Sequence, residues 1–314
     1  MNNEDKRVSP QFTVGVLGPG AVGGLLAAVL GQTGDPVITV ARPATAELIA
    51  QRGISLESVR YGDFIARPRA MERLDAPVDL LFITVKAPDL AASLERVPAD
   101  LLGPGAVVAP LLNGLEHLTR LRERYGPRVA AGSISAEAKY LGPGRVAHTT
   151  PFALIRLASD SDVPAARLAQ VAEFLNRAGL KTEIAPSEAD VVWAKLVRLN
   201  ALACLTAASG LTLGGVLAEP FWQDRLAGAV SEAAAVARAE GYEVSTEEVL
   251  VQLAQLPASL GTSLQRDLEA GRPLELDAIA GAVVRRGQRH GLACKVIQGL
   301  IRDIEARAAE FRPA

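Results

Sequence analysis

Hydrophobic residues in the first half of the chain alternate between short unbroken runs and stretches with a helical repeat. Short apolar runs bounded by turn residues are typical of buried strands, and apolar positions three and four residues apart are typical of helices. Strands that alternate with helices predict an α/β fold with a doubly wound, mainly parallel sheet. The runs predicted as strands are 12–18, 36–41 and 78–86, and segment 105–114 is predicted to be a strand followed by a loop. The helices predicted between and after them are 21–34, 88–96 and 115–126.

The pattern changes along the second half of the chain. Segment 128–158 is predicted to be two strands joined by a turn at Gly142-Pro143-Gly144, since glycine next to proline marks turns. After about residue 183 the apolar positions follow a helical repeat alone, which predicts an all-α region. We therefore expect a flexible tail over 1–10, an α/β domain over 11–184 and an all-helical domain over 185–314. The predicted helices are 187–208, 220–241, 245–256, 263–270, 275–290 and 294–309.

The composition is that of an ordinary globular protein and excludes several classes. The 314 residues are 49% hydrophobic and 22% charged with a net charge of −2, so no excess of positive charge indicates a nucleic-acid partner. Segment 201–218 is uncharged and long enough to span a membrane, but its glycine-rich interruptions argue against a membrane-spanning helix. The polar N-terminus lacks the apolar core of a signal peptide. Cys204 and Cys294 form no disulfide framework, so we expect a cytoplasmic protein.

The three histidines give no metal-binding pattern. Metal sites need clustered ligands, whereas His117, His148 and His290 stand alone in the sequence. We therefore predict no metal and interpret all three as structural.

A glycine-rich turn follows the first predicted strand. In VLGPGAVGG, Gly18, Gly20 and Gly23 form the spacing G-x-G-x-x-G at the start of a helix. The three glycines would permit a tight turn, close approach to a pyrophosphate and close packing of helix on strand. Backbone N–H groups that begin the helix, including those of Ala21 and Val22, would face the phosphates. The alternative is a glycine-rich turn without a ligand.

The end of the second predicted strand indicates which dinucleotide binds. An acid there would bind the ribose 2′-hydroxyl of NAD, but VITVARPAT holds no acid. Arg42 stands about 20 residues beyond the glycines and could pair with a 2′-phosphate, which favours NADP. The alternative is an arginine solvated on a loop.

One lysine lies in an unusually apolar helix. Lys195 falls within DVVWAKLVRLNALACLTAASG, and a buried lysine is costly unless it has a use. The residue is therefore either a surface lysine or a catalytic acid.

Together the motifs resemble the ketopantoate reductase family of 2-dehydropantoate 2-reductases. The glycine turn, VKAPDL (85–90), LLNGLEH (111–117), WAKL (193–196) and the long segment 263–292 occur in the family's order and span nearly the whole chain. The resemblance implies a Rossmann-like NADP-binding domain followed by a helical substrate and dimerisation domain, with the active site in the cleft between them. It also implies NADPH as hydride donor and a 2-oxo acid as acceptor, which becomes a 2-hydroxy acid.

The resemblance also implies roles for particular residues. Lys86 corresponds to a residue near the cofactor's phosphate or ribose, and Asn113 to one near the nicotinamide. Lys195 corresponds to the catalytic lysine, Ser263 to a substrate-binding serine, and Glu275 to a glutamate that contacts cofactor or substrate.

Elementary chemistry agrees with these roles. Hydride arrival places negative charge on the ketone oxygen, and a positioned ammonium can stabilise that charge and donate the proton. Glu275 could hold the ammonium of Lys195, and Ser263 could offer a hydroxyl at a helix N-terminus. The alternatives are a plain N-cap at Ser263, an exposed first-turn acid at Glu275 and a simple turn at Asn113.

The helix of Lys195 departs from the family's pattern. The family places asparagines four and eight residues after the lysine, where one helix face carries all three side chains. Here those positions are Leu199 and Ala203, while Asn200 lies about 140° round the helix. We therefore expect a less polar substrate, with Arg198 as a candidate ligand for its carboxylate and Asn200 as a further candidate contact.

Three functions fit the sequence. The first is NADPH-dependent reduction of a 2-oxo acid by a homodimer. The second is a 3-hydroxy acid or imine dehydrogenase of the related group with a helical C-terminal domain. The third is a non-catalytic NADP-binding sensor, which the loss of both asparagines favours and the presence of Lys195 and Glu275 disfavours.

Overall fold

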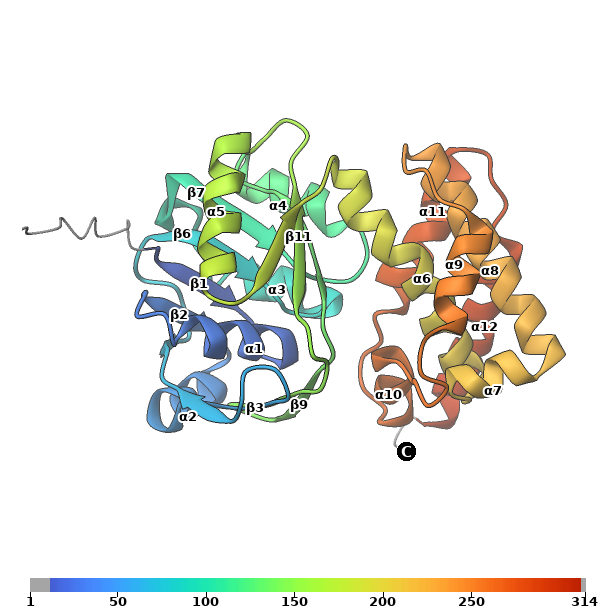
Figure 1. The fold of residues 1–314 in the computed structure, drawn as a ribbon, viewed down its shortest axis with the longest axis horizontal. Helices are drawn as coiled ribbons and strands as arrows, with labels where there is room; N and C mark the ends of the chain where they lie inside the picture. The colour runs from blue at the N-terminus through green and yellow to red at the C-terminus, as the bar shows by residue number, and fades with distance from the viewer. Residues whose placement is uncertain (1–11, 312–314) are drawn as a thin grey trace, which may run out of the picture. The chain divides into compact units, whose positions relative to one another are not determined.

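The computed structural model describes residues 12–311, so the tail predicted over 1–10 lies outside the described residues (Figure 1). The chain forms two compact units. Within the described residues, the first unit runs to Val85 and then takes 89–112 and 118–185. The second unit takes 86–88, 113–117 and the chain from Pro186 onward. Two short pieces of the first half of the sequence therefore belong to the helical unit.

The first unit contains a parallel sheet of five strands in the order β5-β2-β1-β6-β7. The predicted doubly wound α/β fold is confirmed. The central strand is fully buried because its apolar run packs on both faces of the sheet. The strands are β1 (Val14–Leu17), β2 (Val37–Val40), β5 (Arg69–Met71), β6 (Val78–Ile83) and β7 (Leu102–Pro110). The helical segments of this part of the chain are α1 (Ala21–Leu30), α2 (Pro43–Arg52), η1 (Ala87–Asp89), α3 (Leu90–Leu94), η2 (Ala99–Leu101) and α4 (His117–Tyr125). The first two residues of η1 and the first residue of α4 belong to the second unit.

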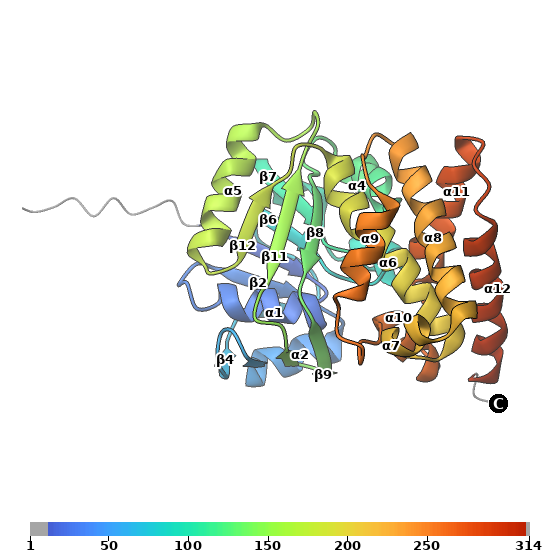
Figure 2. The same cartoon turned by 45° about the vertical axis from the view of Figure 1, so that its right-hand side comes forward.

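Two smaller sheets complete this unit. In one, β11 pairs with β8 and β12, and α5 packs against β12 (Figure 2). The other has the order β4-β3-β10-β9. The prediction of two strands over 128–158 was wrong, because this segment forms four strands in two sheets. The elements are β3 (Ile54–Ser58), β4 (Phe64–Ala66), β8 (Ala131–Ser135), β9 (Ala138–Gly142), β10 (Arg145–His148), β11 (Leu154–Ala158), α5 (Ala165–Arg177) and β12 (Lys181–Ile184).

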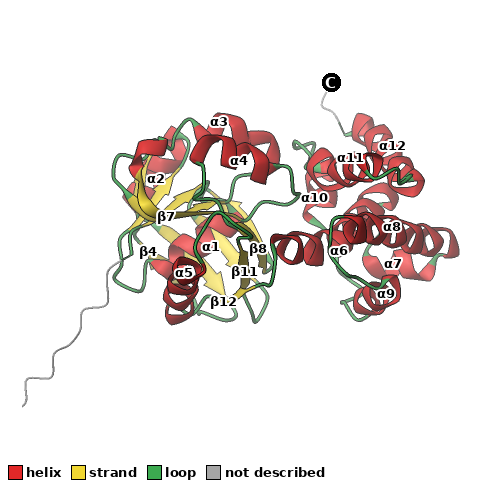
Figure 3. Ribbon diagram, turned by 90° about the horizontal axis from the view of Figure 1, so that it is seen from above, coloured by secondary structure: helices red, strands yellow, loops and turns green. Residues whose placement is uncertain are grey.

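The second unit is all-helical, as predicted, and every described strand belongs to the first unit (Figure 3). The long α6 is its central helix and packs against α8, α10 and α12. Small alanine side chains line the α6 and α8 faces in the buried core, which allows close helix packing. The helical segments are α6 (Glu188–Ser209), α7 (Leu213–Ala218), α8 (Pro220–Ala239), α9 (Thr246–Ala254), α10 (Ser263–Glu269), η3 (Asp277–Gly281), α11 (Ala282–Arg289) and α12 (Lys295–Glu310).

Helix α6 has well-defined ends. Its N-cap Ser187 accepts a hydrogen bond from the Asp190 backbone N–H at 3.1 Å, and Gly210 ends the helix with φ +76°. Among the described helices, α6 alone is long and apolar enough to cross a membrane by length and composition. Two thirds of its most apolar window (67%) is nevertheless buried inside the protein, as in a core helix.

Candidate active site

The glycine turn of the first unit has the geometry of a phosphate cradle. Gly18 has φ +88°, which favours glycine. A Cβ on Gly23 would lie 2.4 Å from the Gly18 carbonyl oxygen and 2.3 Å from Thr84 Oγ1, so only glycine fits there. A Cβ on Gly20 would meet no atom nearer than the Gly18 oxygen at 4.0 Å. The space beside Gly20 is therefore open to a ligand.

The start of α1 suits an anion. Gly20 is the N-cap residue, no side chain caps the helix, and the first turn carries no acid. The N–H groups at a helix start lack partners within the helix and face outward with a partial positive charge. The residues present here, including Ala21 and Val22, therefore fit the diphosphate of a dinucleotide.

Arg42 lies just beyond the end of β2, where the sequence places it. Its guanidinium pairs with the Asp89 carboxylate at 2.9 Å, and the two side chains are 73% and 52% exposed. The alternative of a solvated arginine therefore stays open, because most of the side chain faces solvent and its ion pair is with an exposed acid. A guanidinium at this strand end fits a 2′-phosphate, but Asp89 competes for it.

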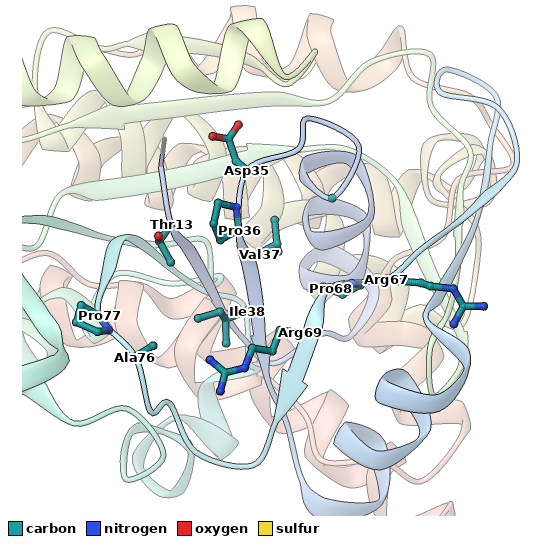
Figure 4. A pocket seen from close by; sticks show the side chains of 11 residues that line it. Thr13, Asp35, Pro36, Val37, Ile38, Arg67, Pro68, Arg69, Ala76 and Pro77 are labelled. Atoms are coloured by element: carbon teal, nitrogen blue, oxygen red, sulfur yellow. The ribbon is translucent and has the colours of Figure 1, made fainter. Parts of the chain in front are cut away.

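A separate hollow lies at the amino-terminal ends of the strands of the five-stranded sheet, opposite the ends from which the glycine turn leaves. Figure 4 shows that Thr13, Asp35 and Pro36 line it near the beginnings of β1 and β2. Its volume is about 430 Å³. Nucleotides bind at the carboxyl ends of parallel strands, so this hollow is not the predicted dinucleotide site.

Glu275 lies at the centre of the candidate site in the second unit. Its side chain is 7% exposed. One carboxylate oxygen accepts from the Asn113 side-chain amide at 3.1 Å, and the other accepts from the Ala87 backbone N–H at 3.2 Å. Glu275 is therefore not an exposed first-turn acid. It joins both short pieces of the first half of the sequence to the helical unit.

Lys195 is half-buried on α6 near this carboxylate. Burial lowers the pKa of Lys195 to about 8, while the Glu275 charge raises it and the Arg198 charge lowers it. A lysine of this pKa is mainly protonated at pH 7 and gives up its proton readily, as a general acid requires. Arg198 is half-buried on the same helix and makes no hydrogen bond or ion pair to another described residue.

Lys86 has a partner that the sequence did not reveal. Its ammonium contacts the carboxylate of Asp267, which also accepts from Arg272 Nε at 2.8 Å. The Asp267 side chain is 6% exposed, so its two cations neutralise a buried charge. One sequence feature could have indicated that Asp267 is buried and needs a cation: it lies on the apolar face of α10, between Leu264 and Leu268.

Two predicted substrate contacts differ in their surroundings. Asn200 is fully buried and its amide donates to the Ile279 carbonyl at 3.1 Å, so its side chain is engaged inside the helical unit and is not exposed to a substrate. Ser263 is the exposed first residue of α10. The N-cap is Thr262, whose hydroxyl accepts from the Gln265 N–H at 3.2 Å, so Ser263 is not the cap. The Ser263 hydroxyl has no partner among the described residues and is available to a ligand.

His117 lies close to Lys195. Burial and the Lys195 charge lower the pKa of His117 to about 4, so its imidazole is neutral at pH 7. His148 bonds Ser58 Oγ at 3.0 Å and His290 bonds Glu240 at 2.7 Å, which are structural contacts. Over residues 12–311, no three His, Cys, Asp or Glu side chains form a group that could hold a metal ion.

A Rossmann-like unit with a glycine-rich turn, followed by a helical unit with a buried glutamate near a lysine, is the arrangement of an oxidoreductase that acts on a CH–OH group. Family models agree: "Ketopantoate reductase PanE/ApbA" matches residues 14–158, and "Ketopantoate reductase PanE/ApbA C terminal" matches residues 189–308. The chain belongs to the ketopantoate reductase family.

Individual relatives support this assignment. The chain is 31% identical to the 2-dehydropantoate 2-reductase of Caulobacter vibrioides over 290 residues, which are 90% of this chain and 94% of the relative. It is 26% identical to the solved PanE/ApbA family ketopantoate reductase from Ralstonia eutropha JMP134, with a TM-score of 0.84 and coverage of 95% and 99%. D-Mandelate dehydrogenase, solved with NADH and anilino(oxo)acetate, has the same fold, with a TM-score of 0.87, 21% identity and coverage of 95% and 99%.

Proposed function

We propose that the protein reduces a 2-oxo acid to a 2-hydroxy acid with NADPH, and that its substrate is 2-dehydropantoate or a relative with a less polar tail. The single observation that carries the proposal is a lysine, Lys195, within electrostatic reach of the buried Glu275: burial lowers the pKa of the lysine to about 8, and the Glu275 charge acts to raise it. The family and the 31% identical relative supply the reaction class.

The reaction has two chemical parts, hydride transfer and proton transfer. When bound, the reduced nicotinamide supplies a hydride to the carbonyl carbon. The carbonyl oxygen then gains a pair of electrons, and the ammonium of Lys195 stabilises this charge and transfers one proton to it. The charge of Glu275 keeps the lysine protonated up to about pH 8. Reduction should therefore be lost as the pH rises through that value.

The residues of the first unit fit NADPH. The open space beside Gly20 and the uncapped start of α1 suit the diphosphate. Arg42 would pair with the 2′-phosphate in place of Asp89. Lys86 and Asn113, which belong to the second unit, would contact the phosphate or ribose and the nicotinamide respectively, as the family resemblance implies.

The substrate's carboxylate has two candidate ligands. Arg198 follows Lys195 by three residues and has no partner among the described residues, so its charge is available. The exposed hydroxyl of Ser263 is the second ligand. Leu199 and Ala203 stand where the family has amides. Ala203 is buried in the core, whereas Leu199 is only half-buried, so the tail of the substrate would meet an apolar side chain at Leu199. This favours substrates with fewer hydroxyls.

Further proposals concern assembly and location. We propose a homodimer, because a ketopantoate reductase of the same fold from Staphylococcus aureus is described as dimeric. The two free, buried cysteines fit the reducing cytoplasm. Sedimentation at several concentrations tests the dimer directly, and a sharp monomer boundary at micromolar protein contradicts it.

The central test combines a substrate screen with a lysine variant. A panel of 2-oxo acids, 3-oxo acids and imines is assayed by loss of NADPH absorbance, and the 2-oxo acids should be the best acceptors. Lys195→Ala should lower kcat about 10²- to 10⁴-fold, the usual contribution of a general acid, with unchanged NADPH affinity. Lys295→Ala, an exposed lysine of the same unit, is the control. Full turnover by Lys195→Ala would remove the proposed acid, and NADPH binding without any acceptor would favour the sensor.

A further inference from the structure

Helix α6 carries two functional positions on different faces. Asn200 follows Lys195 by five residues and therefore points about 140° away from it. The asparagine side chain is 0% exposed, and its Nδ2 donates to the carbonyl oxygen of Ile279 at 3.1 Å. This hydrogen bond joins α6 to η3, which lies 79 residues further along the chain.

The acceptor lies in an unusual helical turn. Segment η3 (Asp277–Gly281) is a π-helix, a rare form that occurs mostly as single turns at functional sites. It begins two residues after Glu275, and the Ile279 N–H donates to the Glu275 carbonyl at 3.0 Å. The turn bonded by Asn200 is therefore the turn that holds the backbone of Glu275.

Keeping an asparagine at this position is costly. Its neighbours Val197, Ala201 and Cys204 are buried apolar residues of the core. The Oδ1 atom of Asn200 is buried and has no hydrogen-bond partner among residues 12–311. A buried polar atom without a partner destabilises a fold, so packing alone would favour an apolar residue here. The hydrogen bond to the Ile279 carbonyl oxygen is the favourable interaction that an asparagine makes at this position and an apolar residue could not.

We propose that Asn200 is a positioning residue that ties the helix of Lys195 to the π-turn after Glu275 and so fixes the separation of the lysine from the glutamate. The proposal deepens the proposed function, since it rests on Lys195 being the proton donor. Asn200 acts through these two residues and touches neither the substrate nor the cofactor.

The charge of Lys195 depends on few groups. Glu275 faces it from the segment before η3, Arg198 from its own helix, and the neutral His117 from the start of α4. Only Glu275 raises the pKa of Lys195. A larger separation between Lys195 and Glu275 must therefore lower that pKa, whereas a general loss of stability would leave it unchanged.

The test replaces Asn200 with leucine, which has a similar size and cannot donate. The pKa of Lys195 is measured on the whole protein by the pH dependence of its acetylation with trace acetic anhydride, read from the Lys195 peptide by mass spectrometry. We expect a fall of about one unit, since a nearby opposite charge shifts a pKa by about 1–3 units. The basic limb of the kcat profile should move by the same amount, with unchanged NADPH affinity.

Two further variants complete the design. Leu205→Ala removes a buried side chain from another face of α6, so it should lower the melting temperature without moving the pKa of Lys195. Asn200→Ser keeps a shorter donor and a smaller side chain, so its shift should lie between those of wild type and Asn200→Leu. It also serves as the test if the leucine variant fails to fold.

The outcomes separate this proposal from the proposed function. An unchanged pKa of Lys195 in a folded Asn200→Leu or Asn200→Ser protein overturns the positioning role. Acetylation reports the pKa without turnover, so the positioning role is measured even if Lys195→Ala remains fully active. That second result would overturn the function and leave the geometry of the lysine and glutamate standing.

Discussion

The Asn113 side chain donates a hydrogen bond to the Glu275 carboxylate at 3.1 Å across a separation of 162 residues. The next residue, Gly114, has φ +90°, and a Cβ there would lie 2.4 Å from the Ala278 carbonyl oxygen. The Asn113-Gly114 pair is thus a turn, as the sequence also allowed, and a turn packed against η3. Its tight packing holds the Asn113 amide against the glutamate.

This arrangement predicts the effect of removing the glutamate charge. Glu275→Gln keeps the shape and one hydrogen-bond acceptor but removes the charge that raises the pKa of Lys195. The pKa should fall below 8, because burial and Arg198 then act without opposition. Reduction needs the protonated lysine, so the basic limb of kcat against pH should move to lower pH.

The control for this variant is Glu269→Gln on α10, an exposed acid that accepts a hydrogen bond from Gln265. It should leave the pH profile in place. A Glu275→Gln profile that matches the wild-type one would show that Glu275 does not set the charge of Lys195.

The glycine turn predicts a contrast between two substitutions. Gly20→Ala adds a methyl group to open space, so the protein should keep its melting temperature and lose NADPH affinity. Gly23→Ala drives a methyl group against Gly18 and should cost about 1–3 kcal/mol of unfolding free energy, as overpacking does. Calorimetry and fluorescence titration with NADPH measure the two effects.

Gly103→Ala is the matched control for both glycines, since a Cβ at Gly103 meets nothing within 4 Å and the residue lies away from the turn. It should bind NADPH normally. Normal NADPH binding by Gly20→Ala would mean that the phosphates lie elsewhere.

The sequence was informative wherever function depends on local spacing. The glycine turn could be predicted because three glycines, a strand and a helix within about 20 residues fix its geometry. The helices of the second unit, except the short α7, followed from their apolar repeat, and Gly210 and Ser187 mark the ends of α6 as caps. The order of motifs that resembles the family also predicts that Lys195 and Glu275 act together, and the charge of Glu275 does reach Lys195 in the structure.

What sequence could not provide are contacts between distant segments. Nothing near Lys86 indicates that its partner is Asp267, 181 residues away. Strands β3, β4 and β5 are three to five residues long, too short for a periodic signal. The sequence over Asp277–Gly281 has the same apolar repeat as an α-helix, so the π-turn could not be predicted from it. The hydrogen bond from Asn200 to the Ile279 carbonyl in that turn could therefore not be predicted either.

The ion pair of Arg42 predicts how cofactor choice can be changed. Asp89→Asn frees the guanidinium for the 2′-phosphate without altering the size of the side chain. Exposed pairs contribute up to about 1 kcal/mol, so the dissociation constant of NADPH should fall about two- to fivefold. The dissociation constant of NADH should not change, because NADH carries no 2′-phosphate.

Titration of both nucleotides measures this effect, and Arg42→Ala provides the opposite case, with weaker NADPH binding and unchanged NADH binding. An equal change for both nucleotides in Asp89→Asn would show that Arg42 does not read the 2′-phosphate.

Leu199 predicts the substrate preference, because it occupies the position one turn after Lys195 on the same helix face. Leu199→Asn restores an amide where the family has one. The amide can bond a hydroxyl of the substrate tail, and one such bond contributes about 1–1.5 kcal/mol, or roughly tenfold. The ratio of kcat/KM for 2-dehydropantoate to that for 2-oxoisovalerate should therefore rise about tenfold.

The half-buried Leu217 on α7 packs against the same core, and Leu217→Asn should cost similar stability with no change in this ratio. If the ratio stays constant in a folded Leu199→Asn protein, the substrate tail does not contact this face of α6.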